Sequence, residues 1–243
     1  MFSLLFYIWI FIELTFFFIL TLLAFVFCVP FDRPRRVIHS LSRAICMCFW
    51  CVPPTWRREI KGLENIDKSK SYVIAINHNS MADILALYFL PLNFRWVSKR
   101  EVFRMPYIGQ FLWLHGDIAI DRGRGAESMR KVIDQGKHWV SLGASIAMFP
   151  EGTRSKDGEM HRFKQGAFAL AKEAGVEILP VVMDGTRDIF KKRSWFFNWR
   201  NCLKISVLPP ISAEEVVSCE TTELMDRTHA MMAAELDVLR GRK

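Results

Sequence analysis

The sequence predicts an α/β fold, in which a mixed, largely parallel sheet is flanked by helices and preceded by an N-terminal membrane-anchoring helical segment. Three observations lead to this prediction. The first 31 residues are almost all apolar, short apolar runs alternate with amphipathic stretches afterwards, and turn-forming or charged residues follow most of these runs. A length of 243 residues suits one compact domain with an appendage.

The N-terminal stretch, residues 1–31, has Glu13 as its single charged side chain. It exceeds the roughly 20 apolar residues that span a bilayer. No basic residue precedes it, and no small-residue cleavage site follows, so we expect a retained anchor rather than a signal peptide. Arg33, Arg35 and Arg36 come directly after it. The positive-inside rule therefore places the rest of the chain on the cytoplasmic side of the inner or plasma membrane.

A second apolar patch, residues 44–54, is too short to span a bilayer. We expect it to form an interfacial or re-entrant helix packed beside the first. The alternative is a two-pass hairpin that enters and leaves on the same side, because Glu13 interrupts the long apolar segment near its middle. Both arrangements assign residues 1–56 to the membrane anchor and residues 57–243 to the α/β domain.

After a charged linker over residues 55–71, the elements of the α/β domain follow from the apolar pattern. Predicted strands cover residues 72–77, 94–98, 117–120, 144–149, 177–183 and 204–208, and predicted helices cover 81–90, 107–115, 125–142, 166–174 and 214–239. Ser80 is placed to cap the first of these helices, and Gly175 closes the fourth. Gly136 is expected to interrupt the helix over 125–142, and Pro180 the strand over 177–183.

The net charge of +8 indicates attraction to anionic surfaces, such as lipid headgroups and acidic substrates. No zinc-finger spacing or RNA-binding signature is present, so nucleic acid is not an expected partner. The six cysteines form no disulfide framework, and the apolar surroundings of Cys46, Cys48 and Cys51 do not favour a metal site. Four histidines without a partner at a telling spacing are expected to be structural or exposed: His115, His138, His161 and His229.

Residues 77–83, Asn-His-Asn-Ser-Met-Ala-Asp, place a histidine between an apolar strand and a helix start. A neutral imidazole at His78 is able to take a proton from a hydroxyl near neutral pH, and Asp83 is placed to orient it. A second interpretation stands beside this one. Ser80-x-x-Asp83 is close to a capping box, in which the carboxylate only satisfies backbone donors at the helix start. The segment alone leaves both interpretations open.

Residues 149–155, Phe-Pro-Glu-Gly-Thr-Arg-Ser, cannot continue a strand through Pro150 and Gly152. A buried strand must therefore open into a tight turn that presents Glu151, Thr153 and Arg154 together. The planar guanidinium of Arg154 matches a pair of phosphate oxygens. The alternative is a solvent-exposed turn with an incidental arginine. Taken with the histidine and aspartate of the first run, the second run favours acyl transfer onto a phosphate-bearing lipid.

Both runs occur in the PlsC-type glycerolipid acyltransferase family, which this sequence resembles. The family's first motif is Asn-His-x4-Asp and its third is Phe-Pro-Glu-Gly-Thr-Arg-Ser. Its second, a glycine and a strand ending in Asp-Arg, resembles residues 116–122, and its proline-containing fourth resembles residues 178–182. Lys99 is similar to a lysine often found ahead of the second motif. The resemblance covers roughly residues 62–211, with four motifs in the family's order.

The resemblance implies roles for individual residues. His78 would be the general base and Asp83 its partner. The cations implied around the acceptor phosphate are Lys99, Arg122 and Arg154, and the residues implied to shape the acceptor site are Glu151, Gly152 and Thr153. The hydroxyl would attack a thioester directly, so no cofactor or metal is expected beyond the donor itself, acyl-CoA or acyl carrier protein.

The implied reaction places a fatty acyl chain on the 2-hydroxyl of 1-acyl-sn-glycerol-3-phosphate (lysophosphatidic acid) and forms phosphatidic acid for phospholipid biosynthesis. Expected partners are membrane lipids, the acyl donor and this acceptor. One alternative is another acceptor, such as a lysophospholipid or a lyso-ornithine lipid. Another is a non-catalytic lipid-binding protein, which would predict a degraded His–Asp pair. Arg187 and the basic, aromatic residues 191–200 suggest membrane contact or, alternatively, a basic surface loop.

Overall fold

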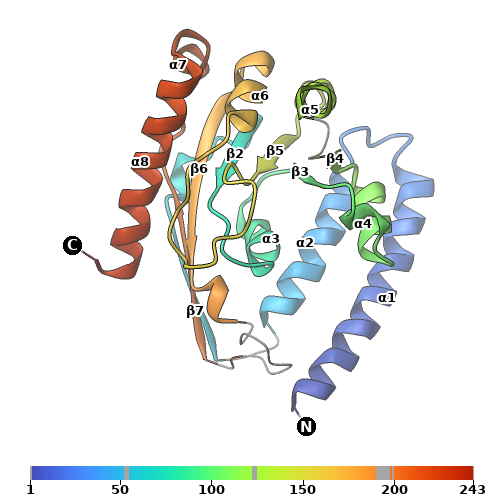
Figure 1. Ribbon diagram of the computed structural model, residues 1–243. Coiled ribbons are helices and arrows are strands. Elements are labelled where there is room, and N and C mark those ends of the chain that lie inside the picture. The colour runs from blue at the N-terminus through green and yellow to red at the C-terminus, as the bar shows by residue number, and fades with distance from the viewer. Residues whose placement is uncertain (1, 52–54, 122–124, 190–197, 199, 243) are drawn as a thin grey trace.

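The computed structural model describes residues 2–51, 55–121, 125–189, 198 and 200–242. Its centre is a seven-stranded sheet in the order β1-β7-β6-β2-β5-β3-β4 (Figure 1). The strands are β1 (Trp56–Lys61), β2 (Tyr72–Ile76), β3 (Phe94–Lys99), β4 (Ile118–Ile120), β5 (Ser145–Met148), β6 (Glu177–Asp184) and β7 (Asn201–Val207). Strands β6, β2, β5, β3 and β4 are parallel, whereas β7 is antiparallel to β6 and parallel to β1. The predicted mixed, largely parallel sheet is confirmed.

Helices cover both faces of this sheet (Figure 1). The α-helices are α1 (Phe2–Cys28), α2 (Arg36–Cys51), α3 (Ala82–Ala86), α4 (Ile108–His115), α5 (Gly125–Ser141), α6 (Gly166–Ala174), α7 (Ala213–Ser218) and α8 (Thr221–Arg240). Short 3-10 turns are η1 (Leu63–Asn65), η2 (Leu87–Phe89), η3 (Val102–Arg104) and η5 (Thr186–Asp188).

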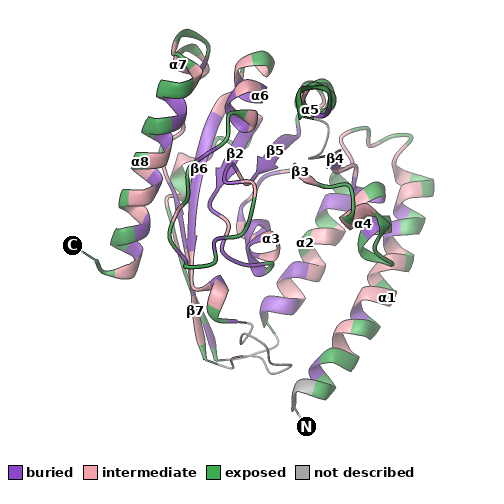
Figure 2. Ribbon diagram, in the orientation of Figure 1, coloured by how far each residue is buried: buried purple, intermediate pink, exposed green. Residues whose placement is uncertain are grey.

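Two hydrophobic cores lie on opposite faces of the sheet, because successive side chains of a strand point to opposite sides. In β2, Ile74 and Ile76 belong to the core under α2 and α3, whereas Val73 and Ala75 belong to the core under α5, α6, α7 and α8. Every residue of β2 is buried, as expected for a central parallel strand covered on both sides (Figure 2).

Helix α1 lies along the outside of the N-terminal half and packs against α2 and α4 (Figure 1). The Phe18 ring meets Tyr107 and Phe111, and Phe25 meets Trp113. The rest of the helix surface is apolar and largely exposed (Figure 2). Leu4–Cys28 is the one stretch of the described residues that is long and apolar enough to cross a membrane, and it indicates membrane association.

The second helix differs from the expected interfacial helix over residues 44–54. Helix α2 begins at Arg36, and its buried side chains share the core of the sheet. Trp50, for example, is 1% exposed and packs against Trp56 of β1. Its hydrophobic face is therefore directed into the protein. The division into an anchor over 1–56 and a domain over 57–243 remains a prediction.

The segment expected to be a linker contains strand β1, which pairs in parallel with β7 along its full length. Its sequence, Trp-Arg-Arg-Glu-Ile-Lys, has no apolar alternation, because most of its side chains are exposed. Edge strands tolerate such charged residues, which also discourage pairing with other chains. Apolar periodicity alone therefore missed it.

Gly136 and Pro180 do not interrupt their elements. A Cβ at Gly136 would lie 2.7 Å from Leu170 Cδ1, so the glycine lets α5 pack closely on α6 within a continuous helix. Pro180 pairs with Ala75, and its carbonyl accepts from Leu208 N, on the side away from β2. A backbone N–H at this position would also point away from β2, so the proline removes no hydrogen bond between β2 and β6.

Helix α3 is shorter than expected and has Met81 as its N-cap, without a side-chain cap bond. Ser80 Oγ nevertheless accepts from Ala82 N at 3.2 Å, so the hydroxyl satisfies an amide at the helix start. Residues 191–197 and 199 of the expected membrane-contact stretch, and Arg122, lie outside the described residues.

Candidate active site

His78 follows β2 at the carboxyl edge of the parallel strands, where the expected motifs meet. The Nδ1 atom of His78 lies 2.9 Å from Asp83 Oδ2. An ionised carboxylate only accepts, so Nδ1 carries the proton and Nε2 keeps its lone pair. The side chain of His78 lines a large pocket and is 13% exposed. The imidazole is thus oriented from behind and open in front, as a general base requires.

Asp83 is fully buried and accepts hydrogen bonds from four groups. Oδ2 receives His78 Nδ1 and the backbone amides of Asn79 and Ser80, the latter two at 2.7 Å, and Oδ1 receives Thr186 Oγ1 at 2.5 Å. The carboxylate therefore satisfies backbone donors at the helix start and orients the imidazole, so both interpretations left open by the sequence apply. Thr186 belongs to η5, 103 residues from Asp83, and no local pattern identified it as a partner.

The His78 imidazole is one of three stacked rings. Its centroid lies 3.8 Å from that of Phe149, with 13° between the planes. Phe149 in turn stacks on Trp96 of β3, with centroids 5.1 Å apart and 20° between the planes. Strands β2, β5 and β3 are neighbours, so the stack runs across the sheet edge. Packing and the bond to Asp83 together fix the plane of the base.

Glu151 lies behind the pocket rather than in it. Its side chain accepts His78 N through Oε1 at 2.8 Å and His161 N through Oε2 at 3.0 Å. Burial raises the pKa of this carboxyl, and the two amide bonds oppose that shift. Both oxygens are used to hold the loops after β2 and β5 together. Of the three residues implied to shape the acceptor site, Gly152 and Thr153 line the pocket.

The pocket has a volume of about 1260 Å³ and has a cationic part and an apolar part. Its cationic side chains are Lys99, Arg154, Lys156, Lys164 and Arg187, and its apolar ones include Met81, Ile84, Val97, Val102, Ile120, Met129, Met148 and Phe149. The structure thus brings two expected phosphate ligands, Lys99 and Arg154, to one cavity with His78. Lys156 and Lys164 were not expected there. An amphiphilic molecule with an anionic end fits such a lining.

The turn at Gly152 depends on a glycine. Its φ angle is 73°, a conformation that other residues rarely adopt. A Cβ at this position would also lie 3.1 Å from Lys164 Cε and Nζ. Lys164 is held next to the turn because its amide donates to Pro150 O at 2.8 Å. Glycine therefore leaves room for the end of the Lys164 side chain beside the turn.

A second histidine–aspartate pair lies buried between α2, α4 and β3. His115 Nδ1 is 2.7 Å from Asp117 Oδ1, which also accepts Trp96 N at 2.7 Å. The Nε2 atom of His115 lies 3.1 Å from His39 Nδ1 and 3.3 Å from Arg95 Nη1. Burial lowers the pKa of both histidines. His115 is structural, as expected, but the sequence did not identify its partners.

The described residues contain no group of three His, Cys, Asp or Glu side chains placed to hold a metal ion. The six cysteines are free thiols. Cys46 is buried against the apolar core, and burial raises its pKa.

Comparison with known proteins shows the family to which the chain belongs. Residues 57–184 match the model of the Acyltransferase family. Human 1-acyl-sn-glycerol-3-phosphate acyltransferase alpha is 34% identical over 178 residues, which cover 72% of this chain and 62% of that protein. The chloroplastic 1-acyl-sn-glycerol-3-phosphate acyltransferase LPAT1 of Arabidopsis thaliana is 34% identical over 182 residues, covering 73% of this chain and 50% of that protein.

The chain thus spans less than two thirds of these relatives' length. The fold is that of the crystal structure of the 1-acyl-sn-glycerophosphate (LPA) acyltransferase PlsC from Thermotoga maritima, with a TM-score of 0.79 and 22% identity. That likeness covers 99% of this chain and 95% of the other. The family match includes the histidine, the aspartate and the arginine turn at the pocket. This chain belongs to the Acyltransferase family.

Proposed function

We propose that the chain is a 1-acyl-sn-glycerol-3-phosphate acyltransferase, which moves an acyl group from acyl-CoA or acyl carrier protein to lysophosphatidic acid. The observation that carries this proposal is the His78–Asp83 pair at the rim of a pocket lined by five described cations. The human and Arabidopsis relatives are named as 1-acyl-sn-glycerol-3-phosphate acyltransferases, which supports the same reaction. A cationic region beside an apolar region matches an acceptor with one phosphate and one acyl chain.

In the proposed reaction, His78 Nε2 takes the proton of the acceptor 2-hydroxyl as its oxygen attacks the thioester carbonyl. The carbon–sulfur bond then breaks, and the proton held by the imidazole is available to the leaving thiolate. Asp83 holds the tautomer and stabilises the imidazolium between these steps. The acyl group passes directly between substrates. Positioning two substrates beside one base supplies much of the rate acceleration, and the proposed sequence of steps uses no cofactor or metal.

Lys99 and Arg154 are proposed to bind the acceptor phosphate, together with Arg122. Both described side chains line the pocket and have no ion pair among the described residues, so their donors are available to a ligand. Lys99 ends β3 and Arg154 follows β5, on adjacent strands. A phosphate between them would be fixed from two directions, and Arg154 would make a paired contact with two of its oxygens. The expected consequence is selectivity for phosphorylated acceptors.

The catalytic part is proposed to face the cytoplasm, with α1 in the membrane. Arg33 and Arg36, which follow α1, are exposed, so they are available to the inner leaflet. Arg35 serves the fold instead, because its guanidinium donates to the carbonyls of Trp113 and Leu114 at 3.1 and 2.9 Å. The apolar outer surface of α1 would hold the protein at the membrane, where its lipid substrate lies.

The test is acyl transfer by purified protein in liposomes, with a labelled acyl thioester, a panel of lysolipid acceptors and His78→Ala as the blank. Selective formation of phosphatidic acid supports the proposal. Transfer to a lysophospholipid or lyso-ornithine lipid would retain the chemistry and replace the acceptor. No His78-dependent transfer, with either donor, would instead favour a lipid-binding protein. Comparing acyl-CoA with acyl carrier protein in the same assay identifies the donor.

Arg154→Ala tests the phosphate assignment separately. We expect the KM for lysophosphatidic acid to rise on the order of tenfold or more, because a charge-assisted bond to phosphate is lost. The KM for the acyl donor should change much less. Equal damage to both constants would assign Arg154 to the fold or to the thioester. The circular dichroism spectrum of the variant serves as the folding control.

A further inference from the structure

Arg240, the last residue of α8, joins two loops of the candidate active site. Its Nη2 donates to Gly158 O at 2.7 Å, and its Nε donates to Asp184 Oδ1 at 3.1 Å. Its Nη1 lies 3.4 Å from both oxygens of Glu159. The side chain is only 14% exposed. All three nitrogens of the guanidinium therefore contact residues that are distant from Arg240 in the sequence.

The first of these loops carries the acceptor-binding cations. Gly158 and Glu159 belong to the segment after β5, in which Arg154 and Lys156 line the pocket. Near its start, Ser155 N donates to His78 O at 2.7 Å. Beyond that point, Arg187 donates to the carbonyl of Lys156. The far part of the loop is held by His161 N, which donates to Glu151, and by Lys164 N, which donates to Pro150 O. Arg240 adds contacts to the residues between them.

The second loop is the turn after β6, which supports both the catalytic carboxylate and another pocket cation. Asp184 ends β6, and Thr186, two residues later, donates to Asp83. Arg187 follows and lines the pocket. Arg240 thus bridges the loop of Arg154 and the turn of Arg187. It also forms ion pairs with Asp184 of this turn and with Glu159 of the loop, which Arg242 contacts as well.

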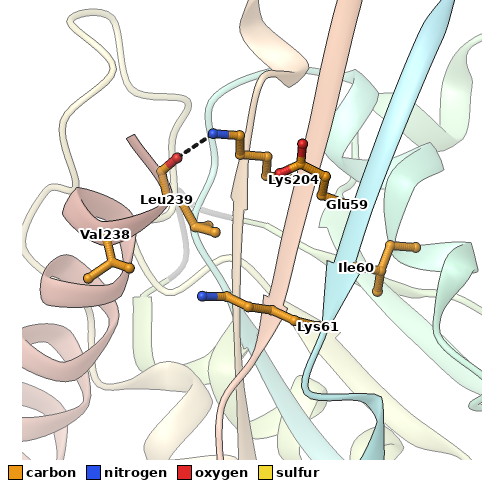
Figure 3. A pocket seen from close by; sticks show the side chains of 6 residues that line it. All are labelled: Glu59, Ile60, Lys61, Lys204, Val238 and Leu239. Atoms are coloured by element: carbon orange, nitrogen blue, oxygen red, sulfur yellow. Dashed lines mark hydrogen bonds between the residues drawn. The ribbon is translucent and has the colours of Figure 1, made fainter. Parts of the chain in front are cut away.

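The end of α8 is itself fixed to the sheet, so Arg240 has a firm support. Lys204 of β7 donates to the carbonyl of Leu239 at 2.6 Å (Figure 3). One turn earlier, Glu235 pairs with Lys61 of β1 at 2.7 Å. These contacts satisfy a carbonyl in the last turn of the helix and fasten α8 to the two strands at that edge of the sheet.

We propose that Arg240 is a positioning residue, which holds the loop of Arg154 and the turn of Arg187 in register for the phosphate of the acceptor. This inference rests on the proposed function. Arg240 does not contact Ser155 N, which donates to His78 O, or the two backbone amides that donate to Asp83. These bonds remain without Arg240, so the base keeps most of its support. The cations around the phosphate lose their alignment. Acceptor binding should therefore weaken much more than turnover.

The experiment compares Arg240→Ala and Arg240→Lys with the full-length enzyme in liposomes. For Arg240→Ala we expect the KM for lysophosphatidic acid to rise about tenfold, with kcat and the donor KM within about threefold of wild type. Arg240→Lys should fall between, because an ammonium cannot reach the carbonyl and both carboxylates in a planar fork. A turnover-independent readout is the inorganic phosphate concentration that half-maximally raises the thermal midpoint, which should increase in the same order.

Arg227→Ala is the matched control, because Arg227 also lies on α8 but pairs with Glu215 of α7, away from both loops. It should leave the acceptor KM and the phosphate titration unchanged. Unaltered phosphate affinity in both Arg240 variants would overturn the inference, as would a fall in kcat that follows the thermal midpoint without a change in acceptor KM. Absence of transfer by the wild type would reject the proposed function instead, and the phosphate titration would still test Arg240.

Discussion

The protein contains two histidine–aspartate pairs of nearly the same geometry in opposite surroundings. His78 Nδ1 lies 2.9 Å from Asp83, and His115 Nδ1 lies 2.7 Å from Asp117. In the first pair the histidine side chain is 13% exposed and lines the pocket. In the second both side chains are 2% exposed, and Nε2 of the histidine is occupied by His39 and Arg95. The hydrogen bond to the carboxylate is therefore shared, and what distinguishes the pairs is an available Nε2 beside a cavity.

The surroundings of the two aspartates differ as well. Asp83 receives only neutral donors, two amides, a hydroxyl and the imidazole, so its charge stays available to stabilise an imidazolium. Asp117 lies close to Arg95. Burial lowers the pKa of Arg95 to about 10, and the charge of Asp117 opposes that shift. A buried pair with its own cation has its charges balanced already and mainly serves the fold.

The largest expected effect is the loss of catalysis in His78→Ala. Removing the general base should lower kcat about a thousandfold, because positioned bases contribute about 10² to 10⁴ in rate. The free energy of unfolding should change less than in His115→Ala, since Asp83 keeps its three other donors. Single-turnover transfer and denaturant unfolding measure the two quantities. Residual activity above a tenth of wild type would remove His78 from the role of base.

His115→Ala should give the opposite result. Loss of the imidazole leaves Asp117 and Arg95 buried without their bridging partner, which we expect to lower the free energy of unfolding by about 3 kcal/mol. The kcat of the folded fraction should stay within about threefold of wild type. Urea unfolding followed by circular dichroism gives the first value. A stable variant with poor turnover would show that this second pair serves catalysis.

Thr186→Val removes one of the four donors to Asp83 and keeps the volume of the side chain. A hydrogen bond to a buried carboxylate contributes about 1.5–3 kcal/mol, so kcat should fall about tenfold or somewhat more. Thr186→Ser, which keeps the hydroxyl, should restore most of the rate. Equal rates for the valine and serine variants would mean that the remaining three donors suffice to hold the carboxylate.

The smallest expected effect concerns pH. Burial lowers the pKa of His39 and of His115 from the ordinary value of 6.5, so below that pH the unfolded chain binds more protons than the folded one. The free energy of unfolding should therefore fall as pH drops from 6.5 toward the folded-state values, by about 1 kcal/mol per group and pH unit. Unfolding at pH 7.5 and 5.5 measures this slope.

His39→Phe tests the origin of the slope. This variant keeps an aromatic ring between Tyr88 and Phe94 and should make the pH dependence of the free energy of unfolding less steep. Parallel profiles would exclude His39 as a source.

The sequence was most informative where the relevant residues are neighbours in the chain. His78 and Arg154 follow buried strands, and Asp83 lies in the first turn of the helix after His78. A parallel sheet brings such strand ends to one edge. The apolar periodicity that located those strands also predicted the fold class. Local spacing therefore sufficed for the dyad and for two of the cations.

Partners that are distant in the chain required the structure. Thr186 and Trp96 reach the dyad through contacts between strands, and Arg240 reaches its loops from the far end of the chain. Glu151 was expected to shape the pocket because it belongs to the motif. Its position in the motif does not show where its carboxylate points, and in the structure it points away from the pocket. Strand β1 was missed for a different reason, since an edge strand with exposed charged residues has no apolar period to detect.

Phe149, which stacks on His78, affects proton transfer through the electrostatics of its ring as well as through packing. When His78 accepts a proton, the imidazolium lies face to face with the Phe149 ring at a centroid distance of 3.8 Å. The electron-rich face of that ring attracts the new positive charge, a quadrupole interaction of about 0.5–1 kcal/mol for partly exposed cations. The Phe149 ring thus adds to the stabilisation of the imidazolium that Asp83 provides. An aliphatic residue of similar volume at position 149 would keep the packing and lose that attraction.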